Sequence, residues 1–202
     1  MVSLLGLGGI FTANMSGNLV FFALAIGGGV QAQAFHSLAA LAGFVVGAAI
    51  GAKLRGPRTT APWSPGVTSA LMLTAVGELG LSIGWVASEG RPGPFLVYVL
   101  IASSAIAMGA QSAAVRLLTD VTTTYLTGTM TALIVDEAAR TESEASAMRR
   151  ISVIVAFVAA GALAAFLLAN ARALAPLVPL ALIFGALVAA RTWQRPGGLL
   201  AT

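Results

Sequence analysis

The most unusual chemical group in this sequence is an acidic residue, Glu78, inside a long apolar segment. It lies within residues 73–81, with several apolar residues on either side. A carboxylate inside a membrane is costly, so it usually faces the protein interior and is often functional. Such a group could carry a proton or contact a solute. The alternative is a protonated glutamic acid that makes one hydrogen bond to a neighbouring helix.

Two hydroxyl–glycine pairs are the second candidate for chemistry. Ser16-Gly17 and Thr127-Gly128 each stand where a short helix is predicted to begin. A hydroxyl oxygen there accepts hydrogen bonds from free backbone N–H groups, and glycine lets another backbone or a ligand approach. The partial positive charge of a helix N-terminus suits an anionic or strongly dipolar solute. The alternative is that both pairs only cap and pack broken helices.

These groups and nearby polar side chains form the predicted solute site. It comprises Asn14, Ser16, Gly17, Asn18, Glu78, Gln111, Thr127, Gly128 and Thr129. Arg116 follows Gln111 by five residues and would either counter an acidic group or extend to the membrane surface. No enzymatic activity is expected, because no Ser-His-Asp set or pair of carboxylates is visible. With one histidine and no cysteine, neither a metal site nor a cofactor is expected.

The composition indicates that these residues belong to a membrane protein. Of the 202 residues, 58% are hydrophobic and only 9% are charged, whereas soluble domains average about 25% charged residues. A soluble globule of this size could not be covered by so few polar side chains. The net charge of +4 does not predict nucleic-acid binding, because no basic run is interleaved with aromatic residues. In a membrane protein, it indicates basic cytoplasmic loops near anionic lipid.

Polar breaks divide the chain into six or seven apolar helical segments, which predicts an all-α, polytopic transmembrane bundle in one membrane domain, residues 1–202. A charge-dense loop is expected over residues 136–150, either a solvated cytoplasmic linker or a short surface helix. The segments cover residues 1–30 with a polar interruption at 12–18, then 36–54, 67–88, 95–118, 121–135, 151–171 and 173–190.

The eleven lysine and arginine residues predict the topology. If every segment from the second onward crosses the membrane, five fall on one side and six on the other. If the fourth and fifth segments together make one net crossing, eight fall on one side and two on the other, with Arg116 between them. The positive-inside rule favours the second arrangement, a cytoplasmic C-terminus and a broken or re-entrant segment over 116–131. The alternative is a simple external loop over 119–124 and an accidental charge bias.

The sequence also contains an internal repeat at an offset of 111 residues. Residues 12–19 (TANMSGNL) match residues 123–130 (TTYLTGTM) in the order of hydroxyl, apolar, glycine and polar positions. The repeats would cover residues 1–90 and 95–191. If each half crosses the membrane an odd number of times, the two halves are inverted relative to one another. Inverted repeats whose broken helices meet around a central site are common in secondary transporters.

Glycines at helical spacing are predicted to let helices pack closely. They are Gly43, Gly47, Gly51, Gly80, Gly84 and Gly161, with Gly161 the counterpart of Gly47 in the second half.

Three blocks of this sequence resemble the YoaK-like family of bacterial inner-membrane proteins. They are residues 11–18 (FTANMSGN), 108–114 (MGAQSAA) and 123–129 (TTYLTGT). The resemblance covers nearly the whole chain and implies a multi-pass protein of the bacterial inner membrane. It implies no substrate, because the family has no known function. Family members resemble one another in a further helix start, ending in Asp, ahead of residues 2–9. Here that start is either truncated or lost, and the acidic position would pair with Gln111 at the repeat offset.

Together these patterns predict a transporter or channel-like protein for a small solute, with a central site between two repeats. Its expected partners are the lipid bilayer, a small polar or anionic solute and a possible second copy of the chain. The alternative is a structural or regulatory membrane protein that assembles through its glycine-rich helix faces.

Overall fold

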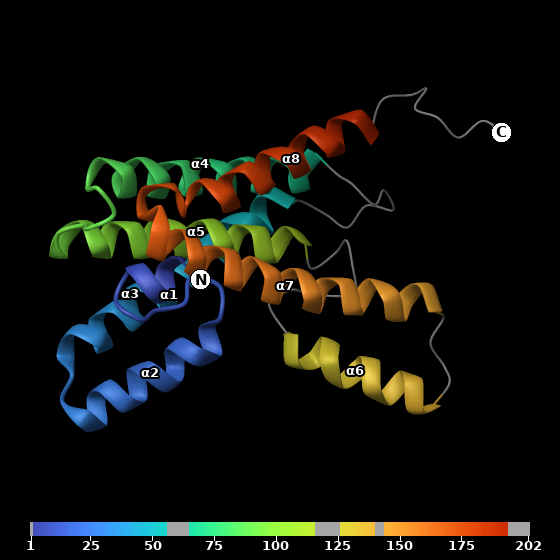
Figure 1. The fold of residues 1–202 in the computed structure, drawn as a ribbon, viewed down its shortest axis with the longest axis horizontal. Helices are drawn as coiled ribbons and strands as arrows, with labels where there is room; N and C mark the ends of the chain where they lie inside the picture. Colours follow the sequence, from blue (N-terminus) through green and yellow to red (C-terminus); the bar gives the residue numbers. More distant parts are fainter. Residues whose placement is uncertain (1, 56–64, 116–125, 140–143, 194–202) are drawn as a thin grey trace.

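The computed structural model describes residues 2–55, 65–115, 126–139 and 144–193. All regular secondary structure in these ranges is helical, which confirms the all-α prediction, and the helices form an elongated bundle (Figure 1). The elements are α1 (Val2–Gly6), α2 (Met15–Gly28), α3 (Gln31–Arg55), α4 (Pro65–Ala87), α5 (Pro94–Val115), α6 (Leu126–Ala139), α7 (Glu144–Asn170), the 3-10 helix η2 (Arg172–Leu174) and α8 (Leu177–Trp193).

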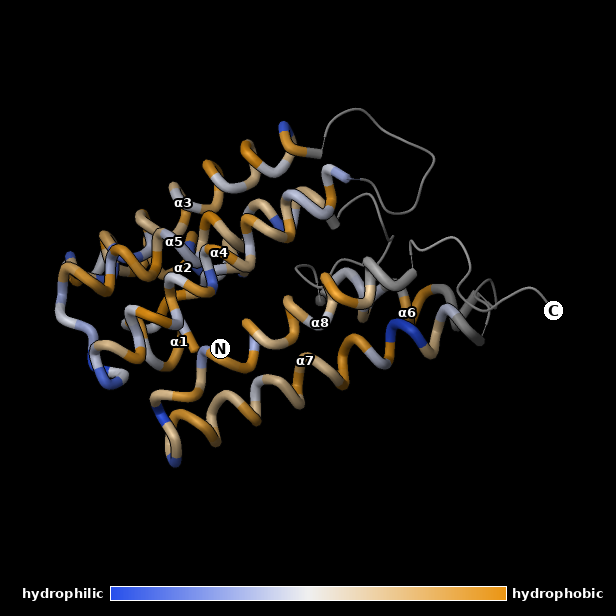
Figure 2. The backbone as a smooth tube through the Cα atoms, turned by 90° about the horizontal axis from the view of Figure 1, so that it is seen from above, coloured by the Kyte–Doolittle hydropathy of each residue, from blue (hydrophilic) through white to orange (hydrophobic). Residues whose placement is uncertain are grey.

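Five helices in the described part of the chain are long and apolar enough to cross a membrane. Hydrophobic residues predominate along α7 and α8, and hydrophilic residues gather at the turn between these helices (Figure 2). Helix α2 is also apolar but has only 14 residues, too few for a full crossing. The candidate spans are Gln31–Leu54, Pro65–Ala87, Pro94–Ala114, Ser146–Asn170 and Arg172–Ala189.

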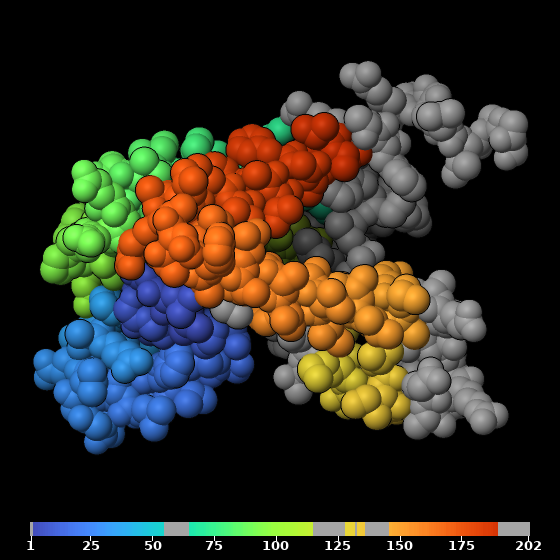
Figure 3. All heavy atoms as spheres, viewed as in Figure 1, coloured from blue at the N-terminus to red at the C-terminus, as the bar shows by residue number. Residues whose placement is uncertain are grey.

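Helices α3, α4 and α5 pack together at the centre of the bundle, with α2 against α3 and α8 against α4. Helix α7 contacts α1 and α6 and crosses the face seen in Figure 3. None of its most apolar 18-residue window is buried. This helix therefore presents an apolar surface that suits lipid.

The closest helix contact is between α3 and α5, and it depends on glycine. Gly43, Gly47 and Gly51 face the α5 backbone, and a methyl group added at Gly47 would overlap the carbonyl oxygen of Ile106. Gly109 of α5 faces the α3 backbone in the same way. The predicted glycine stripe on α3 thus allows close packing within one chain.

The other predicted packing glycines have different surroundings. An added methyl carbon at Gly84 would lie 2.9 Å from Leu100 of α5, whereas one at Gly80 would meet open space. Gly161 of α7 lines a cavity that is described below.

The first apolar segment is broken, as the polar residues near its middle predict. Helix α1 ends at Gly6, and Gly8 and Gly9 have φ angles of 83° and 80°. Glycine adopts this left-handed conformation without the steric cost that a side chain adds. The chain then becomes helical again at Met15.

Three pairs of helices, each with one member early and one late in the sequence, run in opposite directions. Helices α2 (Met15–Gly28) and α6 (Leu126–Ala139) each have 14 residues, and their first residues are 111 positions apart. In the colour sequence of Figure 1, α2, α4 and α7 run toward one end of the bundle, and α3, α5, α6 and α8 run toward the other. Thus α2 and α6, α3 and α7, and α4 and α8 form three pairs of opposite direction.

The charged loop expected over residues 136–150 is helical at both ends. Helix α6 continues to Ala139 and α7 begins at Glu144, because this stretch is rich in alanine, glutamate and arginine, which favour helices. The re-entrant stretch predicted around Arg116 lies largely outside the described residues.

Candidate solute site

A cavity of about 360 Å³ lies among helices from both halves of the chain. Its lining comes from α1, the loop after α1, α4 and α5, and also from α7, α8 and the residues just before α8. A volume of this size is typical of small-molecule sites, which combine apolar walls with a few polar groups. The polar side chains in the lining are Ser3, Thr12, Glu78, Ser104 and Gln111.

Glu78 is the acidic residue of this cavity, and its side chain is only 5% exposed. The Ser104 hydroxyl on α5 donates a hydrogen bond of 2.9 Å to its Oε1 atom. Within the described part of the chain, Oε2 accepts no comparable hydrogen bond. Glu78 is thus held toward α5 by one oxygen and has a second oxygen available at the cavity.

Helix α5 contributes Ser104, Met108 and Gln111 to the lining. Their spacing of four and then three residues places them on one face of the helix. Among the described residues, the Gln111 amide has no hydrogen-bond partner. Sequence reasoning selected Gln111 and missed Ser104, although counting back two helical turns from Gln111 leads to Ser104.

Ser3 and Thr12 add two hydroxyl groups from either side of the chain break. Their side-chain oxygens are 3.4 Å apart, and either one can be the donor. Both residues line the cavity, and Ser3 is buried. Neither was selected as a site residue, because no helical or sequence periodicity connects residues on opposite sides of an irregular loop.

The first predicted motif supports this loop. The Phe11 backbone N–H donates to Asn18 Oδ1 over 3.0 Å, and Asn18 Nδ2 donates to the Phe11 carbonyl oxygen over 2.5 Å. Asn14 caps α2 by accepting hydrogen bonds from the Gly17 N–H and the Ser16 hydroxyl. These four predicted residues are outside the cavity lining, and they hold Thr12 and Ala13 at its edge.

The second predicted motif begins α6. Gly128 is exposed and Thr129 is buried, whereas the side chain of Thr127 lies outside the described residues. Helix α6 packs against α7, and neither Gly128 nor Thr129 is in the lining of the cavity. Of the predicted site residues whose side chains are described, the cavity therefore brings together Glu78 and Gln111.

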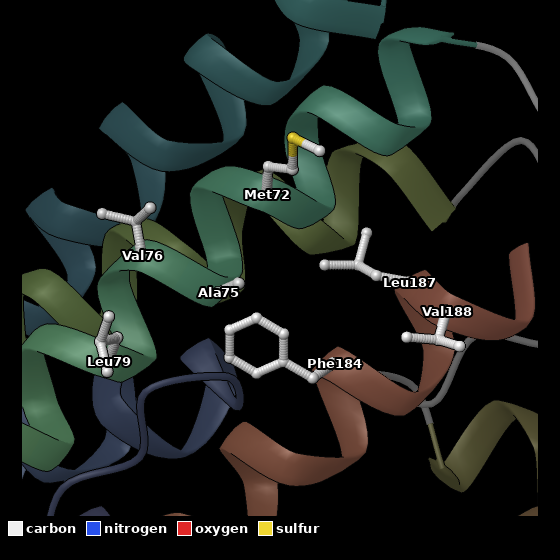
Figure 4. Close-up of a pocket in the computed structure, with 7 residues that line it drawn as sticks. All are labelled: Met72, Ala75, Val76, Leu79, Phe184, Leu187 and Val188. Carbon is white, nitrogen blue, oxygen red and sulfur yellow. The ribbon is translucent and has the colours of Figure 1, made fainter. Parts of the chain in front are cut away.

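A second hollow, of about 310 Å³, lies between α4 and α8 (Figure 4). Its lining residues are all apolar: Met72, Ala75, Val76, Leu79, Phe184, Leu187 and Val188. Its described lining offers a polar solute no side-chain hydrogen bond, so this hollow is a poorer candidate than the cavity at Glu78.

Comparison with known proteins identifies the family of this chain. The family described as "Protein of unknown function (DUF1275)" matches residues 1–190. The chain belongs to the DUF1275 family. It is also 36% identical over 142 residues to the UPF0700 transmembrane protein YoaK of Bacillus subtilis (strain 168). That alignment covers 69% of this chain and 61% of the relative, so the chain spans less than two thirds of the relative's length.

No solved structure matches this DUF1275 chain. The transmembrane relative and the long apolar helices establish it as a multi-pass membrane protein of the YoaK-like type. The family description assigns no function, so the cavity and its residues are the basis for proposing one.

Proposed function

We propose that this protein moves a small solute across the bacterial inner membrane through a site at the Glu78 cavity. The observation that carries the proposal is a nearly buried carboxyl group in the wall of a cavity of about 360 Å³, with helices from both halves around it. Burying a carboxyl group costs stability, which favours a functional role for it.

The arrangement of the helices supports an inverted repeat around this site. The pairs α2 and α6, α3 and α7, and α4 and α8 keep the same order in the sequence and run in opposite directions (Figure 1). Secondary transporters of this type bind their solutes between the repeats and use broken helices there. The broken α1–α2 segment contributes Ser3 and Thr12 to the cavity.

The positions of the basic residues support a cytoplasmic C-terminus. Lys53 near the end of α3 and the Arg149-Arg150 pair early in α7 belong to helix ends on the right of Figure 1, where α8 also ends. Arg91 and Arg172 belong to the opposite end. The positive-inside rule assigns the first end to the cytoplasm.

The glycine contacts weigh against the alternative of assembly through the α3 stripe. Gly43, Gly47 and Gly51 are already packed against α5 of the same chain, so this face is not available to a second copy. A structural or regulatory role would need another surface.

An uptake assay in proteoliposomes tests the proposal. The full chain is reconstituted and exposed to a panel of radiolabelled amino acids, polyamines, sugars and carboxylates, with protein-free liposomes as the background. We expect uptake of at least one solute, reduced by about tenfold or more in Glu78→Gln and in Ala164→Phe, which fills the cavity. Glu89→Gln is the matched control, because Glu89 is exposed in the α4–α5 turn.

Two results would overturn the transport proposal. One is an absence of uptake above background for every solute in the panel by a protein that elutes as a folded, monodisperse species. The other is uptake that is equal in the wild type, Glu78→Gln and Ala164→Phe.

A further inference from the structure

Only one side chain in the described lining of the cavity is acidic or basic. Glu78 is the only acidic or basic residue in the described lining, and none of the described lysine or arginine side chains lines it. Arg172, for example, directs its Nε atom to the carbonyl oxygen of Gly90. A carboxylate that is 5% exposed is stabilised when a positive group approaches it, and the low dielectric of such a site strengthens the attraction.

The hydrogen-bonding groups of the cavity leave acceptors for a ligand. Ser104 occupies Oε1 of Glu78, which leaves Oε2 for a donor. The amide oxygen of Gln111 and the hydroxyl oxygens of Ser3 and Thr12 are further acceptors in the same lining. An ammonium group carries three N–H donors and no acceptor, so it can bond to these acceptors and pair with the Glu78 carboxylate, which a carboxylate or phosphate cannot do.

The rest of the lining is apolar and suits a hydrocarbon body. Leu81, Met108, Phe157, Leu182 and Ile183 contribute to the walls. A ring such as that of Phe157 also attracts cations across its face. The described lining thus combines one acidic side chain, Glu78, with a larger apolar surface.

We propose that the Glu78 cavity binds small organic cations, with an ammonium group at Glu78 and an apolar body against the surrounding side chains. This inference rests on the proposed function and names its class of substrate. It replaces the anionic solute expected from the helix N-termini, because the first turn of α2 and the described residues Gly128 and Thr129 of α6 do not line the cavity.

Three probes that share one apolar body and differ in the head group test this inference. Cyclohexylammonium, cyclohexanol and cyclohexanecarboxylate are titrated calorimetrically into the full chain in nanodiscs, with empty nanodiscs subtracted. We expect cyclohexylammonium to bind at least about tenfold more tightly than either of the other probes. Glu78→Gln should remove this preference, and Glu89→Gln should retain it.

A second variant covers the case in which Glu78→Gln does not fold. Ala164→Phe leaves the carboxyl group in place and fills the cavity, so it should abolish cyclohexylammonium binding. The inference is overturned if cyclohexanol or the carboxylate binds as tightly as the cation, if no probe binds to the wild type, or if folded Glu78→Gln or Ala164→Phe binds the cation as the wild type does.

The two proposals fail in different ways. If uptake of some solute in the panel depends on Glu78 while the cation is not preferred, transport stands and the substrate class is wrong. If the cation binds through Glu78 while no solute in the panel is taken up, the cation site stands and the transport proposal fails.

Discussion

Trp85 on α4 donates its indole N–H to the backbone carbonyl oxygen of Arg172 in η2, over 2.8 Å. The guanidinium carbon of Arg172 lies 5.5 Å from the centre of the Trp85 ring, and Arg172 Nε donates to the Gly90 carbonyl oxygen over 2.7 Å. One turn earlier on α4, the Ser82 hydroxyl donates to the Pro176 carbonyl oxygen over 3.3 Å. These bonds join the α4–α5 turn of the first half to the α7–α8 turn of the second.

Gly90→Ala should weaken this junction. Gly90 has a φ of 72°, and an added methyl carbon would lie 2.9 Å from Cγ of Arg172. The left-handed backbone alone costs a residue with a side chain about 1–2 kcal/mol, so we expect a loss of about that size or more in thermal unfolding in detergent. Gly93→Ala is the matched control, because a methyl group there meets open space. Equal stability of the two variants would contradict the role of Gly90 in this junction.

Gly47→Ala should destabilise the chain without changing its oligomeric state. The added methyl group would overlap the backbone of Ile106 on α5, and a backbone cannot move aside as a flexible side chain can. We expect a loss of about 1–3 kcal/mol, measured by thermal unfolding, with the mass measured by light scattering. Gly80→Ala, in open space on α4, should be neutral or should stabilise the helix by up to about 1 kcal/mol. A change of mass in folded Gly47→Ala would favour assembly through this stripe.

The five longest helices were predictable from the sequence, because each corresponds to an apolar run between polar breaks that is long enough to cross a membrane. The break after α1 was also predictable, since Thr12, Asn14 and Asn18 interrupt one such run. The last residues of α6 and the first residues of α7 fall in the predicted charged loop, for which a short surface helix is the alternative. The charged residues there have high helix propensity, but hydropathy does not distinguish an exposed helix from an exposed loop, so the sequence leaves both open.

The candidate site was only partly predictable. Glu78 stands out because a carboxyl group in an apolar run is expensive, and Gln111 because it is polar in a similar run. Which serines face them depends on how α1, α4 and α5 pack, and many serines in this sequence have equivalent local surroundings. The use of Asn18 for the Phe11 backbone was not predictable either, because it depends on the path of the loop.

Asn18→Leu should destabilise the broken segment. Leucine removes both partners of the Phe11 backbone and leaves its N–H and carbonyl oxygen without the Asn18 amide. Each buried polar group left unpaired costs about 1–3 kcal/mol, so we expect a fall of about 2 kcal/mol or more in the free energy of unfolding. The matched control is Asn14→Ser, since serine also caps helices well and the Asn14 side chain is exposed. Similar losses of stability in both variants would show that the hydrogen bonds between Asn18 and Phe11 do not stabilise the broken segment.

Cysteine labelling in right-side-out spheroplasts should place the end of α3 and the start of α7 on the same side of the membrane. The chain has no native cysteine, so in each single-cysteine variant the maleimide can label only the introduced residue of this protein. We expect a membrane-impermeant maleimide to label Gly93→Cys directly, and to label Lys53→Cys and Met148→Cys only after permeabilisation. The reason is that α4 crosses once and α5 and α6 together cross once, which returns the chain to the basic side. If Met148→Cys is labelled from outside while Lys53→Cys is not, α5 and α6 each cross the membrane, and the two halves are not inverted.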